Sequence, residues 1–277
     1  MNIFDKLLYW LDGNMKTPTN YSWFHIMFIV IILTATILIS YFFKNSSKKT
    51  FNKIMFIGWL IMFVFEIYKQ LNFSFNYENG VVSWDYQWYA FPYQLCSTPL
   101  YVLPFIFLSK DGKLKDAMMS YMMTFSLFGG LAVFVYPNDV FIDTIGINIQ
   151  TMVHHGLQIV LGIFAMVYNR EKLNIHFWLK SLYVFSVLVS IALIANISMY
   201  HILKASGIDE TFNMFYIGPY YDCSLPILSM IYPKIPYICF ILLYILGFGL
   251  ISFILYISQK GIYNLVKKYG NKQKYTN

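Results

Sequence analysis

The sequence predicts an all-α, polytopic membrane protein with seven transmembrane helices. Hydrophobic residues make up 58% of the 277 residues and charged residues only 12%, whereas soluble domains average about 25% charged. The mean hydropathy is +0.55. Seven apolar stretches each reach the roughly 20 residues that a helix needs to cross a bilayer. This composition excludes both a soluble globular domain and an intrinsically disordered chain.

The seven predicted helices follow one another through short connections. They cover residues 22–43, 53–73, 88–108, 116–136, 149–168, 177–203 and 235–257. No linker, low-complexity segment or clear internal repeat divides the chain, so we expect one domain over residues 1–277. The three cysteines contain no Cys-x-x-Cys pair, which argues against a disulfide scaffold or a zinc knuckle.

The N-terminal segment has the pattern of a short amphipathic helix. Phe4, Leu7, Leu8 and Leu11 recur at helical spacing, while the charged residues of this segment lie off that stripe. Such a helix places its apolar face in the membrane interface. A charge-flanked apolar core with a small-residue cleavage site is missing, so we do not expect a cleavable signal peptide.

Basic residues gather in alternate connections between the apolar stretches. Fifteen Lys and Arg fall in residues 44–53, 109–115, 169–180 and the tail after the last stretch, against four in residues 1–21, 74–87, 137–148 and 204–234. The positive-inside rule then places the N-terminus outside and the C-terminus in the cytoplasm. Frequent Asn, Ile, Lys, Phe and Tyr with a single Arg is typical of an AT-rich bacterial genome, so we expect a bacterial cell membrane. Topology and contact with anionic lipid account for the net charge of +7. Nucleic acid is not an expected partner.

Polar and reactive residues of several predicted helices fall at a similar depth. At about 1.5 Å per residue, Cys96 lies about 12 Å below the outer surface and His154 and His155 about 8–9 Å below it. The same count puts four further residues in this outer half: Glu66, Asn196, Lys69 and His25. Because ionisable groups inside a membrane are costly and usually functional, we expect a polar cavity that opens to the outer side.

Each of these polar residues also has a purely structural explanation. Glu66 and Lys69 are three residues apart and neutralise one another on one helix face. Gln158 follows the two histidines by one turn and can hydrogen-bond a histidine or a neighbouring helix. Asn196 fits the usual role of an intramembrane amide that joins two helices. The glycines at 129–130 favour close helix packing, with room for a ligand tail as the alternative.

The third predicted helix combines a cysteine with a proline. Pro99 removes the hydrogen bond to the carbonyl of Leu95 and should bend the helix beside Cys96. Gln94 and other polar residues surround the thiol in sequence. A thiol attacks as the thiolate and needs a nearby base or cation at neutral pH, which His154 or His155 can provide. A small packing residue is the alternative role for Cys96.

Several short motifs together resemble the YwaF-like bacterial integral membrane family, which is related to transmembrane protein 164. They are, in chain order, Tyr21-Ser22-Trp23-Phe24-His25, Phe91-Pro92-Tyr93-Gln94-Leu95-Cys96-Ser97, His154-His155-Gly156-Leu157, Asn196, Asn213-Met214-Phe215-Tyr216 and Tyr232-Pro233-Lys234-Ile235-Pro236-Tyr237. The family's cysteine corresponds to Cys96 and its His-Gly pair to His155-Gly156. The motif at Asn213 departs from the family's usual Asn-Tyr-Met-Phe, which leaves the role of Asn213 open.

The resemblance implies a cysteine-dependent acyltransferase of phospholipids. In this interpretation Cys96 accepts an acyl group as a thioester and His155 acts as general base, with His154, Glu66 or Asn196 orienting it or polarising the carbonyl. The expected partners are membrane lipids, including an acyl-donor lipid, and no cofactor is expected. Acyl transfer and hydrolysis on a (lyso)phospholipid both fit these residues.

Two alternatives use the same polar residues. One is a metal-dependent hydrolase built on His25, the histidine pair and Glu66, but adjacent histidines point about 100° apart on a helix and no His-Glu-x-x-His motif exists. We therefore expect no metal. The other is a non-enzymatic transporter or lipid- or solute-binding protein. The absence of a polar path through the inner halves of the helices disfavours alternating access.

Overall fold

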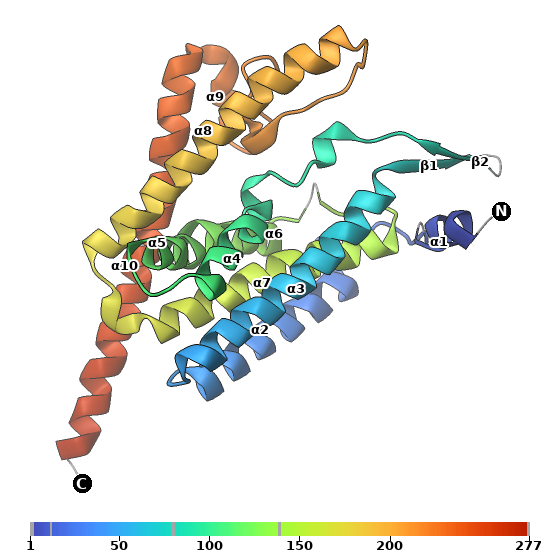
Figure 1. Ribbon diagram of the computed structural model, residues 1–277. Coiled ribbons are helices and arrows are strands. Elements are labelled where there is room, and N and C mark those ends of the chain that lie inside the picture. The colour runs from blue at the N-terminus through green and yellow to red at the C-terminus, as the bar shows by residue number, and fades with distance from the viewer. Residues whose placement is uncertain (1–2, 12, 79–80, 138–139, 276–277) are drawn as a thin grey trace.

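Six long apolar helices form the body of the protein. The computed structural model describes residues 3–11, 13–78, 81–137 and 140–275 (Figure 1). The helices long and apolar enough to cross a membrane within this part are α2 (Trp23–Phe43), α3 (Lys48–Asn72), the run of α5 (Lys113–Tyr121) into α6 (Leu127–Val135), α7 (Ile145–Tyr168), α8 (Ile175–Ala205) and α10 (Tyr237–Tyr275). These confirm the all-helical membrane architecture and six of the predicted stretches.

The stretch at 88–108 is not one helix, so this prediction is wrong over its first half. Two short 3₁₀ turns, η1 (Trp88–Ala90) and η2 (Leu95–Ser97), are separated by non-helical residues, and only α4 (Pro99–Leu108) is α-helical. Pro99 begins a helix instead of bending one. A proline is well tolerated at the first helical position, where its missing N–H has no intrahelical partner.

The run from α5 to α6 contains a π-helical turn, η3 (Met122–Ser126). The side-chain amide of Gln259 in α10 donates to the Met123 carbonyl oxygen over 2.6 Å. Gly162 of α7 faces the same turn, where an added Cβ would lie 2.8 Å from the Met122 carbonyl oxygen. α7 and α10 therefore both pack directly on the irregular backbone.

The centre of the bundle is formed by α7 and the α5–α6 run. In the most apolar stretch of each, 67% of the residues are buried, against 28% or less in α2, α3, α8 and α10. α7 packs against α2, α3 and α6. Side chains on a central helix can reach several neighbouring elements, and both histidines of the predicted site lie on α7.

A β-hairpin and the N-terminal helix lie beside the end of α3. Strands β1 (Phe75–Glu78) and β2 (Val81–Trp84) pair antiparallel, with Phe75 opposite Trp84. Helix α1 (Ile3–Leu11) confirms the predicted N-terminal helix and packs on the hairpin through Phe4 and Phe75, whose ring centroids are 5.4 Å apart (Figure 1). The side chains of Leu8 and Leu11 lie outside the described part, and the interfacial position of α1 stays a prediction.

The last long connection joins α8 to α10. It contains the 3₁₀ turns η5 (Met214–Tyr216) and η6 (Tyr232–Lys234) and the short helix α9 (Leu228–Ile231). Phe215 and Tyr216 have φ angles of 57° and 56°, a left-handed conformation that is unusual for large side chains. Such strain persists only where surrounding contacts hold it, and here the contacts come from predicted site residues.

Candidate active site around Cys96

The segment around Cys96 is not α-helical, and its prolines deprive it of hydrogen-bond donors. Pro92 and Pro99 have no backbone N–H, and Phe91 before Pro92 is extended with ψ of 133°. The Leu95 carbonyl, which the sequence predicts to be freed by Pro99, accepts the Thr98 hydroxyl over 2.6 Å. Thr98 also shares a 2.7 Å hydrogen bond with the buried Tyr121 hydroxyl.

Two side chains of α7 hold the backbone of Cys96. His154 Nε2 and Gln158 Nε2 each lie 2.9 Å from the Cys96 carbonyl oxygen. A carbonyl only accepts hydrogen bonds, so His154 carries its proton on Nε2. Both side chains are buried, and Gln158 is fully so. The structure therefore brings three predicted site residues together and fixes the position of the cysteine against α7.

His155 is oriented differently from its neighbour. Its Nδ1 lies 2.7 Å from the Thr151 carbonyl oxygen, so Nδ1 donates and Nε2 of the neutral ring keeps its lone pair. The two histidine rings are 5.7 Å apart between centroids. Among the described residues no hydrogen bond joins the Cys96 thiol to either ring. Each neutral ring therefore keeps one lone pair, on His155 Nε2 and on His154 Nδ1, and the latter is buried without a hydrogen-bond partner among the described residues.

Two glycines let α6 approach this cluster closely. A Cβ added to Gly129 would lie 3.9 Å from Cys96 Cβ and 3.1 Å from Gln158 Oε1. A Cβ added to Gly130 would lie 2.6 Å from the His155 carbonyl oxygen, closer than real Cβ contacts allow. This geometry supports the packing explanation for both glycines.

We expect Gly130→Ala to destabilise the protein by about 1–3 kcal/mol, the usual cost of overpacking. The contact is with backbone, which cannot move aside as a flexible side chain can. Thermal unfolding of the purified protein in detergent measures this loss. Gly247→Ala in α10 is the matched control, because nothing lies within 4 Å of its added Cβ. Equal shifts for both variants would show that α6 does not pack as described.

An ion pair on α3 is linked to the chain just before Cys96. Lys69 Nζ lies 2.8 Å from Glu66 Oε1, with side-chain exposures of 16% and 7%. The Glu66–Lys69 pair thus has the structural role considered from the sequence, since the two charges neutralise one another on one face of α3. Gln70 donates from Nε2 to Glu66 Oε1 over 2.7 Å and to the Ala90 carbonyl oxygen over 3.0 Å. Tyr86 donates to Gln70 Oε1 over 2.9 Å. Burial and the Glu66 charge raise the pKa of Tyr86 to about 12, so Tyr86 keeps the proton that it donates.

Gln94 connects the cysteine segment to the loop between α8 and α10. Its Nε2 donates to the Asn213 carbonyl oxygen over 3.0 Å and its Oε1 accepts from Phe215 N over 2.7 Å. Asn196 makes a second paired contact, to the carbonyl oxygen and the N–H of Met214 over 2.9 and 2.7 Å. These amides hold the left-handed backbone of the η5 turn above the site.

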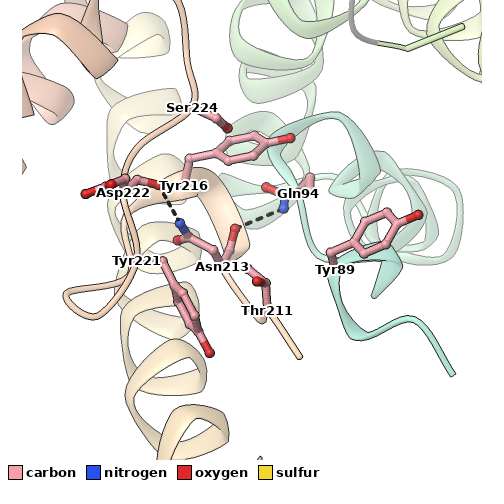
Figure 2. Close-up of a pocket in the computed structure, with 8 residues that line it drawn as sticks. All are labelled: Tyr89, Gln94, Thr211, Asn213, Tyr216, Tyr221, Asp222 and Ser224. Atoms are coloured by element: carbon pink, nitrogen blue, oxygen red, sulfur yellow. Dashed lines mark hydrogen bonds between the residues drawn. The ribbon is translucent and has the colours of Figure 1, made fainter. Parts of the chain in front are cut away.

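The side chain of Asn213 makes hydrogen bonds within the same loop. Its Oδ1 accepts from Gly218 N over 2.7 Å and its Nδ2 donates to the Asp222 carbonyl oxygen over 3.2 Å. Figure 2 shows Asn213 between Gln94 and Asp222. A polar pocket of about 310 Å³ lies here, lined by Tyr89, Gln94, Thr211, Asn213, Tyr216, Tyr221, Asp222 and Ser224. This pocket contains two predicted site residues, Gln94 and Asn213, but it is not lined by Cys96, the histidines or the other residues from which the sequence predicts a polar cavity.

His25 lies apart from this cluster. It is fully buried in α2 beside Phe134 and Phe141, with ring centroids 6.1 and 5.8 Å away, and its Nδ1 accepts from Tyr21 N over 3.0 Å. Within the described chain it shares no hydrogen bond with Cys96 or with either histidine of α7. The same part of the chain shows no group of three His, Cys, Asp or Glu that could hold a metal ion.

Comparison with known proteins gives one match. The model of the TMEM164 family matches residues 20–256. The chain belongs to the TMEM164 family. The matched region contains Cys96, His154, His155 and Gln158, and it omits α1 and the end of α10. The match confirms the relation to transmembrane protein 164 that the motifs indicate. No curated protein and no solved structure is significantly similar to the chain.

Several polar side chains of this TMEM164 family member satisfy hydrogen bonds of irregular backbone. Non-helical backbone at membrane depth is tolerated only where protein groups satisfy its hydrogen bonds. Gln70, His154, Gln158 and Gln94 do this for residues 90–97 and for the loop above them. Sequence reasoning left Gln70 out of the site, although it follows Glu66 by one helical turn on the same face.

Proposed function

We propose that the protein is an integral membrane lipid-modifying enzyme in which Cys96 is the nucleophile for acyl transfer or hydrolysis on a (lyso)phospholipid. The observation that carries the proposal is the double hydrogen bond from His154 and Gln158 to the Cys96 carbonyl. It fixes a reactive side chain on irregular backbone against α7, the helix that also carries His155, whose Nε2 keeps its lone pair. Family membership supports the same assignment.

In the proposed reaction His155 Nε2 takes the proton of the Cys96 thiol. The thiolate attacks the carbonyl carbon of a lipid ester, the ester C–O bond breaks, and the leaving alkoxide receives the proton from His155. A lysophospholipid hydroxyl, or water in hydrolysis, then attacks the thioester while His155 accepts its proton. The new ester or acid forms, and the proton returns to the Cys96 sulfur. Hydrogen bonds between nucleophile and base commonly tighten only when substrate binds.

The topology that we propose completes this assignment. The segment 88–108, with α4 as its helical part, is the seventh membrane crossing, and the distribution of basic residues places the N-terminus outside. The η5 turn and the polar pocket then face the outer side, where a lipid headgroup lies. The lipid chains extend along the apolar inner halves of the helices.

A covalent intermediate on Cys96 tests the proposal directly. We expect vesicles of phosphatidylglycerol and phosphatidylethanolamine with deuterated acyl chains to add one acyl mass to Cys96, found by mass spectrometry of the intact protein and its peptides. Neutral hydroxylamine should remove this mass, because it cleaves thioesters. No acylation of Cys96 under conditions in which labelled lipid turns over would contradict the role of the thiol.

Solute or lipid binding without chemistry is the second candidate. The observation that favours it is the polar pocket at Gln94 and Asn213, which excludes Cys96 from its lining. Uptake of a solute by proteoliposomes, dependent on a proton gradient and unchanged in Cys96→Ser, would support this candidate against the enzyme.

A further inference from the structure

A second pocket lies at the opposite end of the bundle from the hairpin. The α2–α3, α4–α5 and α7–α8 connections meet there (Figure 1). Arg170 Nη1 donates to the Lys44 carbonyl oxygen over 2.9 Å, and Lys48 Nζ lies 2.9 Å from Asp111 Oδ2. The pocket encloses about 300 Å³ and is lined by Lys48, Phe51, Asp111, Lys115, Met119, Tyr168, Asn169, Glu171 and Lys172.

The connections around this pocket carry a strong excess of basic residues, and its lining has three lysines against two carboxylates, Asp111 and Glu171. Residues 44–53, 109–116 and 169–180 contain ten Lys and Arg but only three acidic residues. Two of these carboxylates are each shared between two ammonium groups. Asp111 contacts Lys48 and Lys115, and Asp116 contacts Lys172 and Lys180 over 2.9 and 3.0 Å. Each set of three keeps one excess positive charge.

The ammonium group of Lys115 is buried, and its charge is only partly neutralised by a carboxylate. Its side chain is 3% exposed and its Nζ is 2.9 Å from Asn52 Oδ1, a neutral acceptor. Its acidic partner, Asp111 Oδ1, is 3.6 Å away on a side chain that is 67% exposed. Asn52 is oriented by donation to the Phe107 carbonyl oxygen over 3.2 Å. A buried charge needs a well-placed counter-ion, and the pocket leaves room for one.

The floor of the pocket is apolar. Phe51 is fully buried and stacks on Tyr168 with ring centroids 4.0 Å apart, and Met119 is 3% exposed. An apolar floor beneath lysines suits a molecule that joins a phosphate group to an apolar part. Basic pockets between transmembrane helices bind anionic lipid headgroups in this way.

We propose that this pocket binds the phosphate group of an anionic phospholipid, held by Lys48, Lys115 and Lys172 at the end of the bundle remote from Cys96. Asp111 occupies part of the same space and competes with the phosphate for Lys48 and Lys115. The hydrogen bond from Lys48 is the main cause that holds the pKa of Asp111 below its usual value, so the competing carboxylate is charged at neutral pH.

Thermal unfolding of the full-length protein in detergent, with added phosphatidylglycerol, phosphatidylcholine or inorganic phosphate, tests this site. We expect phosphatidylglycerol to stabilise the protein more than phosphatidylcholine. Lys48→Gln and Lys172→Gln should each weaken the apparent affinity about fivefold, the effect of one lysine near an anionic headgroup. Lys49→Gln is the matched control, because Lys49 is exposed on the same turn of α3 and does not line the pocket.

Asp111→Asn provides a test in the opposite direction. Removing the competing carboxylate should tighten phosphatidylglycerol binding, a gain that a misfolded variant cannot produce. Stabilisation by inorganic phosphate with the same dependence on the two lysines would identify free phosphate as a source of the ligand. Equal stabilisation by both lipids, or equal affinities for wild type, Lys48→Gln and Lys172→Gln, would overturn the proposal.

Discussion

Replacing Cys96 by serine should reduce acyl transfer by at least about 1,000-fold while leaving the folded protein intact. When a nucleophile and its base act as a unit, removing the nucleophile alone loses most of the rate enhancement that the unit provides. A serine hydroxyl is a much weaker nucleophile than a thiolate at neutral pH. The backbone carbonyl that His154 and Gln158 bind is unchanged by this substitution, so the thermal unfolding midpoint should stay within about a degree of wild type.

The assay is transfer of a labelled acyl chain from phospholipid to lysophospholipid by purified protein in vesicles. Cys239→Ser is the matched control, because Cys239 is a free, exposed cysteine on α10. We expect full activity for this control. Wild-type rates in Cys96→Ser would refute the nucleophile, whereas a loss in both cysteine variants would point to a general effect of thiol removal.

The second large effect should come from His155→Asn. Asparagine can place its amide N–H where Nδ1 lies and keep the hydrogen bond to the Thr151 carbonyl, but it has no nitrogen with a lone pair. Loss of a general base costs about 10²–10⁴-fold in rate. The remaining activity should rise with pH, because hydroxide then forms the thiolate without a base.

His154→Gln is the matched variant on the neighbouring residue. The glutamine amide can donate to the Cys96 carbonyl as His154 Nε2 does, so we expect a loss of less than about tenfold with the pH profile of wild type. The pair of variants separates a base from a positioning residue. A larger loss in His154→Gln than in His155→Asn would show that His154 is the base and His155 the positioning residue, contrary to our assignment.

Hydropathy predicts the helices of this protein well because lipid-facing helices are apolar over their whole length. α2 begins within a residue of its predicted start and ends at the predicted residue, and α7 and α8 are each only a few residues longer than predicted. Length and apolarity are properties of each segment alone. Tertiary contacts are not needed to recognise them.

The same criterion fails where backbone geometry depends on distant partners. Residues 88–98 are joined to the apolar residues 99–108 as one stretch, and Pro99 alone indicates a kink as readily as a helix start. Hydropathy also does not detect strands β1 and β2, although Asn79-Gly80 between β-forming residues is a typical turn signal. The irregular stretch at 88–98 forms because side chains from other helices complete its hydrogen bonds.

The sequence predicts which residues belong to the candidate site, but it does not predict which of them contact one another. Depth counting places Cys96, His154 and Asn196 at a similar level, and the structure joins the first two directly. Gln158, for which the sequence suggests a bond to a histidine or a neighbouring helix, donates to the Cys96 carbonyl. Asn196 instead holds the η5 turn, and His25 packs among phenylalanines. Which atom of a side chain is used depends on where the neighbouring carbonyl lies, and a one-dimensional depth does not contain that information.

The crossing that we propose at residues 88–108 depends on parts of the chain that are synthesised at very different times. Residues 90–97 rely on Gln70, made earlier, and on His154, Gln158 and the N–H of Phe215, which leave the ribosome some 60 to 120 residues later. Until those partners are made, moving this stretch into lipid would leave its peptide groups unpaired, each costly in hydrocarbon. Its insertion should therefore be completed late, and a chain truncated after α6 should expose residues 88–98 to water-soluble thiol reagents at Cys96.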